Sequence, residues 1–459
     1  MVFNSIFFIF CFLPVFMLIY YLVPGKLRNL LLFLGSLIFY AWGEPVYVIL
    51  MLFSSVFNYY MGTELERLYY DDKKQKLNLV FAIIINLGIL VFFKYYGFLL
   101  DTFGGITGIH ISHPELSLPI GLSFYTFRNL SYLFDIYISK ITAQQNFLTF
   151  ATYSTMFPAG PIIRYADIQE QLERRSVNIS RFGAGTELFI KGLAKKVLLA
   201  DNLSALYAGI CSNTQMSVLT AWIGILTFTM QIYFDFSGYS DMAIGLGKML
   251  GFDFNKNFDY PYISTSVSEF WRRWHISLGS WFRDYIYIPL GGNRVSVIKH
   301  IRNILVVWAL TGLWHGASWN FVLWGLYYGL LLLLEKFVLN NLLDRLPSWL
   351  RTAYTMVAVM IGWVFFSQTN FSALGHYLGA LFGIGASSFA DTTALYYLKT
   401  GLILFIISIL ACRPGLYQRF RRLIQQKPAG ALLINLILLA LSVAYMVYNS
   451  YTPFLYAKF

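Results

Sequence analysis

The chain has 459 residues, of which 58% are hydrophobic and only 12% are charged, against about 25% charged residues in an average soluble domain. Its mean hydropathy is +0.60. This composition excludes an ordinary soluble protein and indicates an all-α, polytopic integral membrane protein. The net charge of +12 would suit nucleic acid, but the basic residues form short clusters between apolar runs, as membrane-protein loops do. We expect no nucleic-acid partner, and leave open a role of these clusters in attracting membrane lipids or an anionic cofactor.

Apolar runs long enough to cross a membrane recur along the chain. They lie near residues 3–23, 28–43, 46–62, 77–100, 119–138, 185–208, 216–234, 303–317, 320–339, 350–367, 396–412 and 431–450. Shorter stretches near 147–160, 236–250 and 372–386 are expected to be re-entrant or interfacial. This pattern predicts about eleven to thirteen transmembrane helices. Because no repeat and no flexible linker interrupts them, we treat residues 1–459 as a single membrane domain, with C-terminal helices from about 331 onward.

Clusters of Lys and Arg predict the orientation, because such clusters remain in the cytoplasm. Lys26 and Arg28 follow the first run, which places the N-terminus outside. The first run lacks a preceding basic segment and a following cleavage site, so we expect a retained span and not a signal peptide. Basic segments at 164–196, 256–302 and 413–427 are likewise expected in the cytoplasm. The last helix then runs outward and the C-terminus is external, provided that the stretch after residue 371 does not cross fully.

His315 lies in the apolar stretch from Asn303 to Trp319, which is expected to be a membrane-spanning helix. At about 1.5 Å per residue, it lies roughly 20 Å along the helix axis from the basic end at Arg302, well inside a hydrocarbon core of roughly 30 Å. An ionisable side chain at that depth indicates a functional site, and imidazole is a common general base. The alternative is a histidine that bridges two helices by hydrogen bonds. The expected helix face around it suits the lining of a tunnel and holds Trp308, Thr311, Gly312, Ser318 and Trp319.

The segment 268–294 is too polar for a span and too aromatic for a free loop. It predicts an amphipathic or partly buried helix pair on the cytoplasmic side. His275 follows Arg272 and Arg273 there, and arginine suits phosphate through bidentate hydrogen bonds. The alternative is an interfacial helix whose arginines contact lipid headgroups.

The segment 231–245 places Asp235 and Asp241 in a Gly/Ser-rich stretch, which we expect to be a turn that breaks a helix. A spacing of six does not put the two carboxylates on one helix face, so capping of the broken helix is the preferred role for Asp235. The run Phe157 to Pro161 must also break a helix, either to line a cavity or to form a tight loop.

Neither metal chemistry nor disulfides are expected from the sequence. Cys11, Cys211 and Cys412 occur singly in or beside apolar runs, with no CxxC spacing. There is also no HxxxH pattern and no cluster of carboxylates with histidines, so no metal site is predicted. No Gly-x-Ser-x-Gly elbow indicates a serine hydrolase.

Four segments together resemble the membrane-bound O-acyltransferase (MBOAT) superfamily, and within it the subfamily of bacterial alginate O-acetylation proteins. They are WRRWHISLGSWFRDYIYIPLGGNR (271–294), QIYFDFSGYSDMAIGLGKMLGF (231–252), PIGLSFYTFRNLSYLFDIY (119–137) and LTGLWHGASWNFVLWG (310–325). The opening 24 residues and FYAWGEP (39–45) are similar to that subfamily as well. The likeness runs from residue 1 to about residue 330, and the remaining helices match only in character.

The resemblance implies a ring of tilted helices around a thinned centre, with cytoplasmic and external funnels that meet in a central tunnel. It implies that His315 is the catalytic histidine and that His275 is a second one on the cytoplasmic side. It further implies a cytoplasmic thioester donor and release of the acyl group at the outer face, often with an extracytoplasmic partner of the SGNH-hydrolase type. The short run at 157–161 departs from the family pattern, in which a few more residues separate Phe-Pro from Gly-Pro.

We therefore expect a membrane O-acyltransferase in the bacterial inner membrane that transfers acetyl groups from acetyl-CoA or an acyl carrier. No bound cofactor is expected. The acceptor would be a polysaccharide hydroxyl or a serine of the SGNH-type partner, and His315 would be the general base. His275 would orient or polarise the thioester carbonyl, and Trp274, Trp308, Trp314 and Trp319 would exclude water. The residues expected to bind the donor are Arg272, Arg273, Trp274, Arg283 and Arg294.

Two alternatives remain at this point. The first is D-alanyl transfer to teichoic acid, which uses related chemistry with a carrier protein as donor. The second is a non-enzymatic polysaccharide or lipid transporter, in which the broken helices at 157–161 and 236–245 would form a central binding site.

Overall fold

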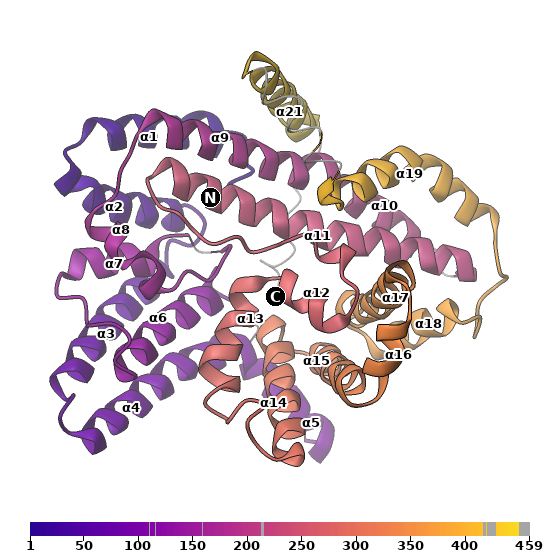
Figure 1. The fold of residues 1–459 in the computed structure, drawn as a ribbon, viewed down its shortest axis with the longest axis horizontal. Coiled ribbons are helices and arrows are strands. Elements are labelled where there is room, and N and C mark those ends of the chain that lie inside the picture. Colours follow the sequence, from indigo (N-terminus) through magenta and orange to yellow (C-terminus); the bar gives the residue numbers. More distant parts are fainter. Residues whose placement is uncertain are drawn as a thin grey trace. The chain divides into compact units, whose positions relative to one another are not determined.

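A computed structural model describes residues 1–109, 111–114, 116–157, 159–212, 215–415, 419 and 428–448. Within these ranges the regular structure is helical throughout, without strands, which confirms the all-α prediction (Figure 1). The contacts divide the chain into two compact units, one made of residues 1–189 and 243–255, the other of residues 190–242 and 256–459. The expectation of a single membrane domain over the whole chain stays a prediction.

The first unit is built around one buried helix. Its helices are α1 (Leu13–Leu22), α2 (Arg28–Ala41), α3 (Val48–Arg67), α4 (Asp72–Leu90), α5 (Tyr96–Thr107), α6 (Leu122–Tyr137), α7 (Phe147–Thr155), α8 (Tyr165–Glu173) and most of α9 (Ile179–Ala194). Helix α6 is buried along nearly its whole length and packs on α3 and α4. Its Arg128 guanidinium donates to the carbonyls of Tyr153 (3.0 Å) and Met156 at the end of α7. A buried cation thus satisfies carbonyls that a helix terminus leaves without intrahelical donors.

The second unit carries the segments that the sequence singles out for chemistry. Its helices are α10 (Asp201–Cys211), most of α11 (Val218–Met249), α12 (Val267–Arg273), α13 (Ile276–Phe282), α14 (Val297–His315), α15 (Trp319–Leu334), α16 (Asn340–Arg345), α17 (Ser348–Ser367), α18 (Phe371–Leu381), α19 (Thr392–Ala411) and α21 (Pro428–Tyr448). The predicted helix pair within 268–294 is therefore present as α12 and α13.

Six helical segments of the described chain are long and apolar enough to cross a membrane, fewer than the predicted spans. They are Asp72–Thr107, Val218–Met249, Trp319–Arg345, Ser348–Ser367, Thr392–Ala411 and Ala429–Tyr448. Several other predicted runs form helices shorter than the ~20 residues that a simple crossing needs. Helix α1 has 10 residues, α2 has 14 and α6 has 16. The basic cluster at 413–427 and the C-terminal residues 449–459 lie largely outside the described residues.

The predicted helix break at 236–245 is wrong, because α11 runs unbroken through it. Its glycines serve close packing. A Cβ on Gly238 would meet the Gly192 carbonyl oxygen of α9 at 2.7 Å. Two ion pairs stabilise the same contact between helices. Asp241 pairs with Lys195 at 2.6 Å and Asp235 with Lys196 at 2.6 Å. Asp235 therefore forms a buried ion pair within a continuous helix and does not cap a broken one.

The predicted continuous helix through Trp319 is also corrected, since α14 ends at His315. Gly316 is extended, and α15 begins at Trp319, so Ser318 and Trp319 do not share a helix face with His315. The two helices pack as a hairpin (Figure 1). A Cβ on Gly312 would lie 2.2 Å from the Phe321 carbonyl oxygen, so only glycine permits this backbone approach. His315 thus occupies the tip of a hairpin and not the middle of a span.

Candidate active site

The turn between α12 and α13 is fixed by capping at the start of α12. The Ser266 hydroxyl accepts from the Glu269 backbone N–H at 3.0 Å. The buried Glu335 carboxylate, in the helical turn that follows α15, accepts from the Val267 N–H at 2.6 Å and from the Ser268 N–H at 3.0 Å. An anion at a helix N-terminus is favourable both for hydrogen bonding and for the helix dipole. Helix α12 is thereby attached to α15, which fixes the helix pair that carries His275.

His275 is the second of the two residues between α12 and α13 and has a left-handed backbone, with φ of 43°. Such a conformation costs of order 1–3 kcal/mol for a residue other than glycine and is common at functional sites. The imidazole is 2% exposed. Its ring lies 4.6 Å from Phe236 and 5.7 Å from Trp314 between centroids. Burial lowers the pKa of His275 to about 3, so the ring is neutral at physiological pH.

Asn257 holds this strained turn with both its backbone and its side chain. Its carbonyl oxygen accepts from the Ile276 N–H at 2.9 Å. Its Oδ1 accepts from the Ser277 N–H at 3.1 Å and lies 3.2 Å from His275 Nδ1. Its Nδ2 donates to Ser240 Oγ at 3.1 Å. A chain of hydrogen bonds therefore runs from α11 to the imidazole.

His315 lies in an aromatic enclosure and is also 2% exposed. Its ring centroid is 5.0 Å from Trp314, 4.8 Å from Trp324 and 5.4 Å from Phe366. Trp314 contacts both imidazoles, so one indole separates the two histidines. The structure thus brings together the two histidines that lie 40 residues apart in the sequence.

A cavity of about 410 Å³, the His275 cavity, opens between α12, α13, α14 and the end of α15. Its lining includes Thr311, one helical turn before His315, although His315 itself does not line it. Its basic and polar wall consists of Arg272, Arg283, Lys336, His300, Tyr287 and His275. The cavity therefore joins a cationic wall to the imidazole of His275. No group of three potential metal ligands gathers among the described residues.

The predicted donor-binding residues separate into two groups. Arg272, Trp274 and Arg283 line the His275 cavity. Arg273 does not, because its guanidinium is paired with Glu269 at 2.8 Å. Arg294 does not line the cavity either. Among the predicted aromatic walls, Trp308 lines it and Trp314 is buried, whereas Trp319 is 46% exposed at the start of α15.

Three further cavity residues escape the sequence analysis. The Tyr287 hydroxyl lies 3.0 Å from His300 Nε2, and Lys336 Nζ lies 3.4 Å from the same nitrogen. Burial and then the Lys336 charge lower the pKa of His300. Tyr287 lies within the segment 271–294, although no pattern in the sequence singles it out there. The only sequence signal for His300 and Lys336 is that each lies near the end of an apolar run.

The helical structure, with six described segments long and apolar enough to cross a membrane, agrees with a membrane acyltransferase. Residues 46–374 match the model of the membrane-bound O-acyltransferase family, and the chain belongs to that family. It is therefore an acyltransferase and a multi-pass membrane protein. This confirms the resemblance described above.

The relatives are enzymes of O-acylation. The chain is 39% identical over 440 residues to the probable alginate O-acetylase AlgI of Pseudomonas aeruginosa, covering 94% of this chain and 84% of that protein. It is 34% identical over 428 residues to the peptidoglycan O-acetyltransferase of Helicobacter pylori, covering 84% of this chain and 81% of that protein. It is 28% identical over 258 residues to the teichoic acid D-alanyltransferase of Streptococcus thermophilus, covering 52% of this chain and 59% of that protein.

Proposed function

We propose that this protein transfers an acetyl group from cytoplasmic acetyl-CoA to a hydroxyl group at the outer face of the membrane. One observation carries the proposal. The rings of His275 and His315 both contact that of Trp314, with ring centroids 5.7 and 5.0 Å apart, and the cavity with the cationic wall reaches His275. Cations suit the phosphates of the donor, and imidazoles suit proton transfer at the acyl group. The aromatic rings around both histidines exclude water, which protects a thioester from hydrolysis.

The donor would bind in the His275 cavity with its phosphates at the basic wall. Arg272 and Arg283 offer planar donors for phosphate oxygens, and Lys336 adds a point charge. Arg283 is also bound to Asp284 at 2.7 Å, so Arg272 is the better candidate. Arg273 has its partner in Glu269, and we give Arg273 and Arg294 no part in donor binding.

His315 would act as the general base. The imidazole takes the proton of the acceptor hydroxyl while the hydroxyl oxygen forms a bond to the thioester carbonyl carbon. The C–S bond then breaks, and the imidazolium returns the proton to the departing thiolate. The products are an O-acetyl ester and the free thiol of coenzyme A. Thr311 lines the cavity one helical turn before His315. The acyl end of the donor would approach the His315 imidazole at that point.

His275 would orient the donor as a hydrogen-bond acceptor. Asn257 Oδ1 accepts from the Ser277 N–H, so an oxygen faces His275 Nδ1 and that nitrogen carries the proton. In the neutral ring Nε2 then has a lone pair and no hydrogen. Such a nitrogen accepts from an amide N–H of the donor arm. This role differs from polarisation of the carbonyl, which would need a donor.

The acceptor would be a cell-surface polysaccharide, reached directly or through an extracytoplasmic partner of the SGNH-hydrolase type. The names of the relatives from P. aeruginosa and H. pylori, an alginate O-acetylase and a peptidoglycan O-acetyltransferase, support a sugar hydroxyl as the final acceptor. We further propose that both termini face outward, the N-terminus because of Lys26 and Arg28 and the C-terminus because of the basic cluster at 413–427. Reporter fusions at each terminus test this orientation.

The test compares His315→Ala with His376→Ala, a matched control on the exposed surface of α18. Membrane vesicles receive radiolabelled acetyl-CoA and alginate oligosaccharides, and thiol release and label in ester linkage are measured together. We expect His315→Ala to lower both by about 10²–10⁴-fold and His376→Ala to match the wild type. Normal transfer by a correctly inserted His315→Ala protein would overturn the mechanism.

D-alanyl transfer is the main alternative, and the choice of donor tests it. The D-alanyltransferase relative matches only 52% of the chain. Label from D-alanyl carrier protein, but not from acetyl-CoA, would favour it. The transporter alternative is weaker because α11 is continuous where a central break was required.

A further inference from the structure

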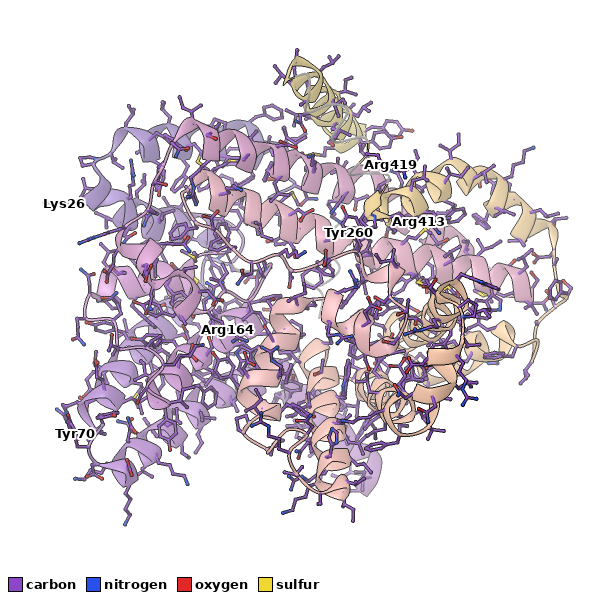
Figure 2. All side chains as sticks on the ribbon, viewed as in Figure 1. Lys26, Tyr70, Arg164, Tyr260, Arg413 and Arg419 are labelled. Carbon is purple, nitrogen blue, oxygen red and sulfur yellow. The ribbon has the colours of Figure 1, made fainter. Side chains whose placement is uncertain are left out.

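A second cavity, of about 770 Å³, lies in the second unit and shares no lining residue with the His275 cavity. We call it the Arg413 cavity. Its mouth includes the first turn of α17, with Ser348, Trp349 and Thr352, and the residues after α19, with Arg413 and Arg419. Figure 2 labels both arginines beside the end of α19. Two candidate spans therefore end at this cavity, Thr392–Ala411 and Ser348–Ser367.

The charge around the Arg413 cavity favours an anion. Two of its lining residues are arginines, and none of the described residues that line it is acidic. The α17 N-terminus adds the positive end of a helix dipole, and its N-cap residue Pro347 forms no side-chain capping hydrogen bond. Guanidinium groups bind phosphate oxygens in a bidentate manner. The mouth is thus suited to a phosphate group.

The interior of the same cavity is largely apolar. Leu226 and Met230 of α11, Met356 of α17 and Ile409 of α19 line it. At its edge the Trp349 indole is 69% exposed, as is typical of tryptophan at a membrane–water interface. A free phosphate ion would gain nothing from this interior, whereas an acyl chain would be buried there.

We propose that the Arg413 cavity binds an anionic phospholipid, with its phosphate between Arg413 and Arg419 and an acyl chain along the apolar wall. The basic cluster that these arginines begin is expected on the cytoplasmic side, where anionic lipids attract basic residues. Tyr262 lines the cavity, and its ring lies 6.1 Å from that of Trp274, which lines the His275 cavity. A bound lipid would therefore support the wall of the active site from outside. The binding itself does not depend on acyl transfer.

Lipid binding is measured by native mass spectrometry of the full-length protein in detergent, titrated with phosphatidylglycerol or with phosphatidylcholine of the same chains. The test variant is Arg413→Gln/Arg419→Gln. The control is Arg174→Gln/Arg345→Gln, which removes two exposed arginines outside the cavity. We expect the wild type and the control to prefer phosphatidylglycerol. The test variant should bind it roughly 25-fold more weakly, at about fivefold for each arginine.

Two competitors identify the source of the phosphate. Inorganic phosphate at millimolar concentration should not displace the lipid, and coenzyme A should not either. Displacement by inorganic phosphate would assign the site to a free anion, and displacement by coenzyme A would assign it to the acyl donor. Either result overturns the lipid proposal. Equal binding of phosphatidylglycerol by the wild type and the Arg413/Arg419 variant would overturn it as well.

Discussion

His275 Nδ1 lies 3.2 Å from Asn257 Oδ1, an oxygen that also accepts from the Ser277 N–H at 3.1 Å. The second bond fixes which end of the amide faces the ring. Asn257 therefore determines the tautomer of His275 and stabilises its left-handed backbone at the same time. Because the Asn257 amide also donates to Ser240, the orientation of the imidazole is linked to α11.

Replacement of Asn257 by Asp should change the pH profile of acetyl transfer. In the wild type the pKa of His275 is about 3, so we expect no titration of this ring above pH ~5. A carboxylate in contact with the ring favours its charged form and raises its pKa. The proposed role needs the neutral ring, so activity should fall as the pH decreases through the raised value. An acidic limb in kcat/KM that the wild type lacks is the expected result.

Asn257→Ala is the companion variant, because it removes the acceptor without adding a charge. A displacement of about 1 Å at a reacting centre can cost ~10²-fold in rate, so kcat should fall strongly while no acidic limb appears. If Asn257→Asp and Asn257→Ala instead showed the same pH profile, Asn257 would be structural only. Circular dichroism of both purified variants checks that they fold.

Trp314→Ala should uncouple thioester cleavage from transfer. The indole is buried and contacts both histidine rings, so its loss opens a space for water beside the reacting carbonyl. We expect the ratio of thiol release to ester formation to rise, together with a stability loss of about 3–5 kcal/mol. Trp319→Ala is the matched control, since that ring is 46% exposed. A ratio that stays at the wild-type value in both variants would contradict the proposed exclusion of water.

The sequence singled out His315 because an ionisable ring in an apolar segment is rare and costly, and it singled out His275 through the family resemblance; the catalytic roles of both stay predictions. It also allowed prediction of the helical character of nearly every segment. The role of Asn257 could not be predicted from the sequence, because it depends on the left-handed backbone of His275. Tertiary contacts impose that backbone conformation. Arg272 and Arg273 are adjacent and identical in the sequence, and only the fold gives one to the cavity and the other to Glu269.

Two errors in the predicted helix boundaries share one physical cause, which is that glycine can either end a helix or allow two helices to pack closely. In the stretch 236–245 the glycines predict a helix break, whereas Gly238 permits two continuous helices to pack closely. Around His315 the opposite error occurred. Gly316 ends α14, although the apolar run continues to Trp319 and predicted one helix. Helix propensity does not distinguish a glycine that permits close packing from one that ends a helix. The difference depends on whether the backbone of another helix lies against the glycine in the folded protein.

Lys196 should be essential for stability, since it lies buried between two carboxylates. Its Nζ is 2.6 Å from Asp235 and 2.7 Å from Asp201. Lys196→Met leaves one buried and one partly buried carboxylate without their cation, which should cost about 3–5 kcal/mol and lower the thermal midpoint in detergent. Lys195→Met is the control, because its pair with Asp241 is partly exposed and such pairs contribute roughly 0–1 kcal/mol. Equal midpoints for the two variants would show that the Lys196 pairs contribute no more than a surface pair.

Gly312→Ala should disrupt the hairpin that presents His315. The added Cβ would lie 2.2 Å from the Phe321 carbonyl oxygen and 3.4 Å from the Gly325 Cα, so backbone must move against backbone. Helices α14 and α15 would separate, and His315 would shift relative to Trp324 on the opposite helix. We expect a lower thermal midpoint and a loss of transfer of about 10²-fold. Gly375→Ala in α18 is the control, since no atom lies within 4 Å of its added Cβ, and alanine should stabilise that helix by about 1 kcal/mol. A Gly312→Ala protein with wild-type transfer would show that the position of His315 does not depend on this close contact.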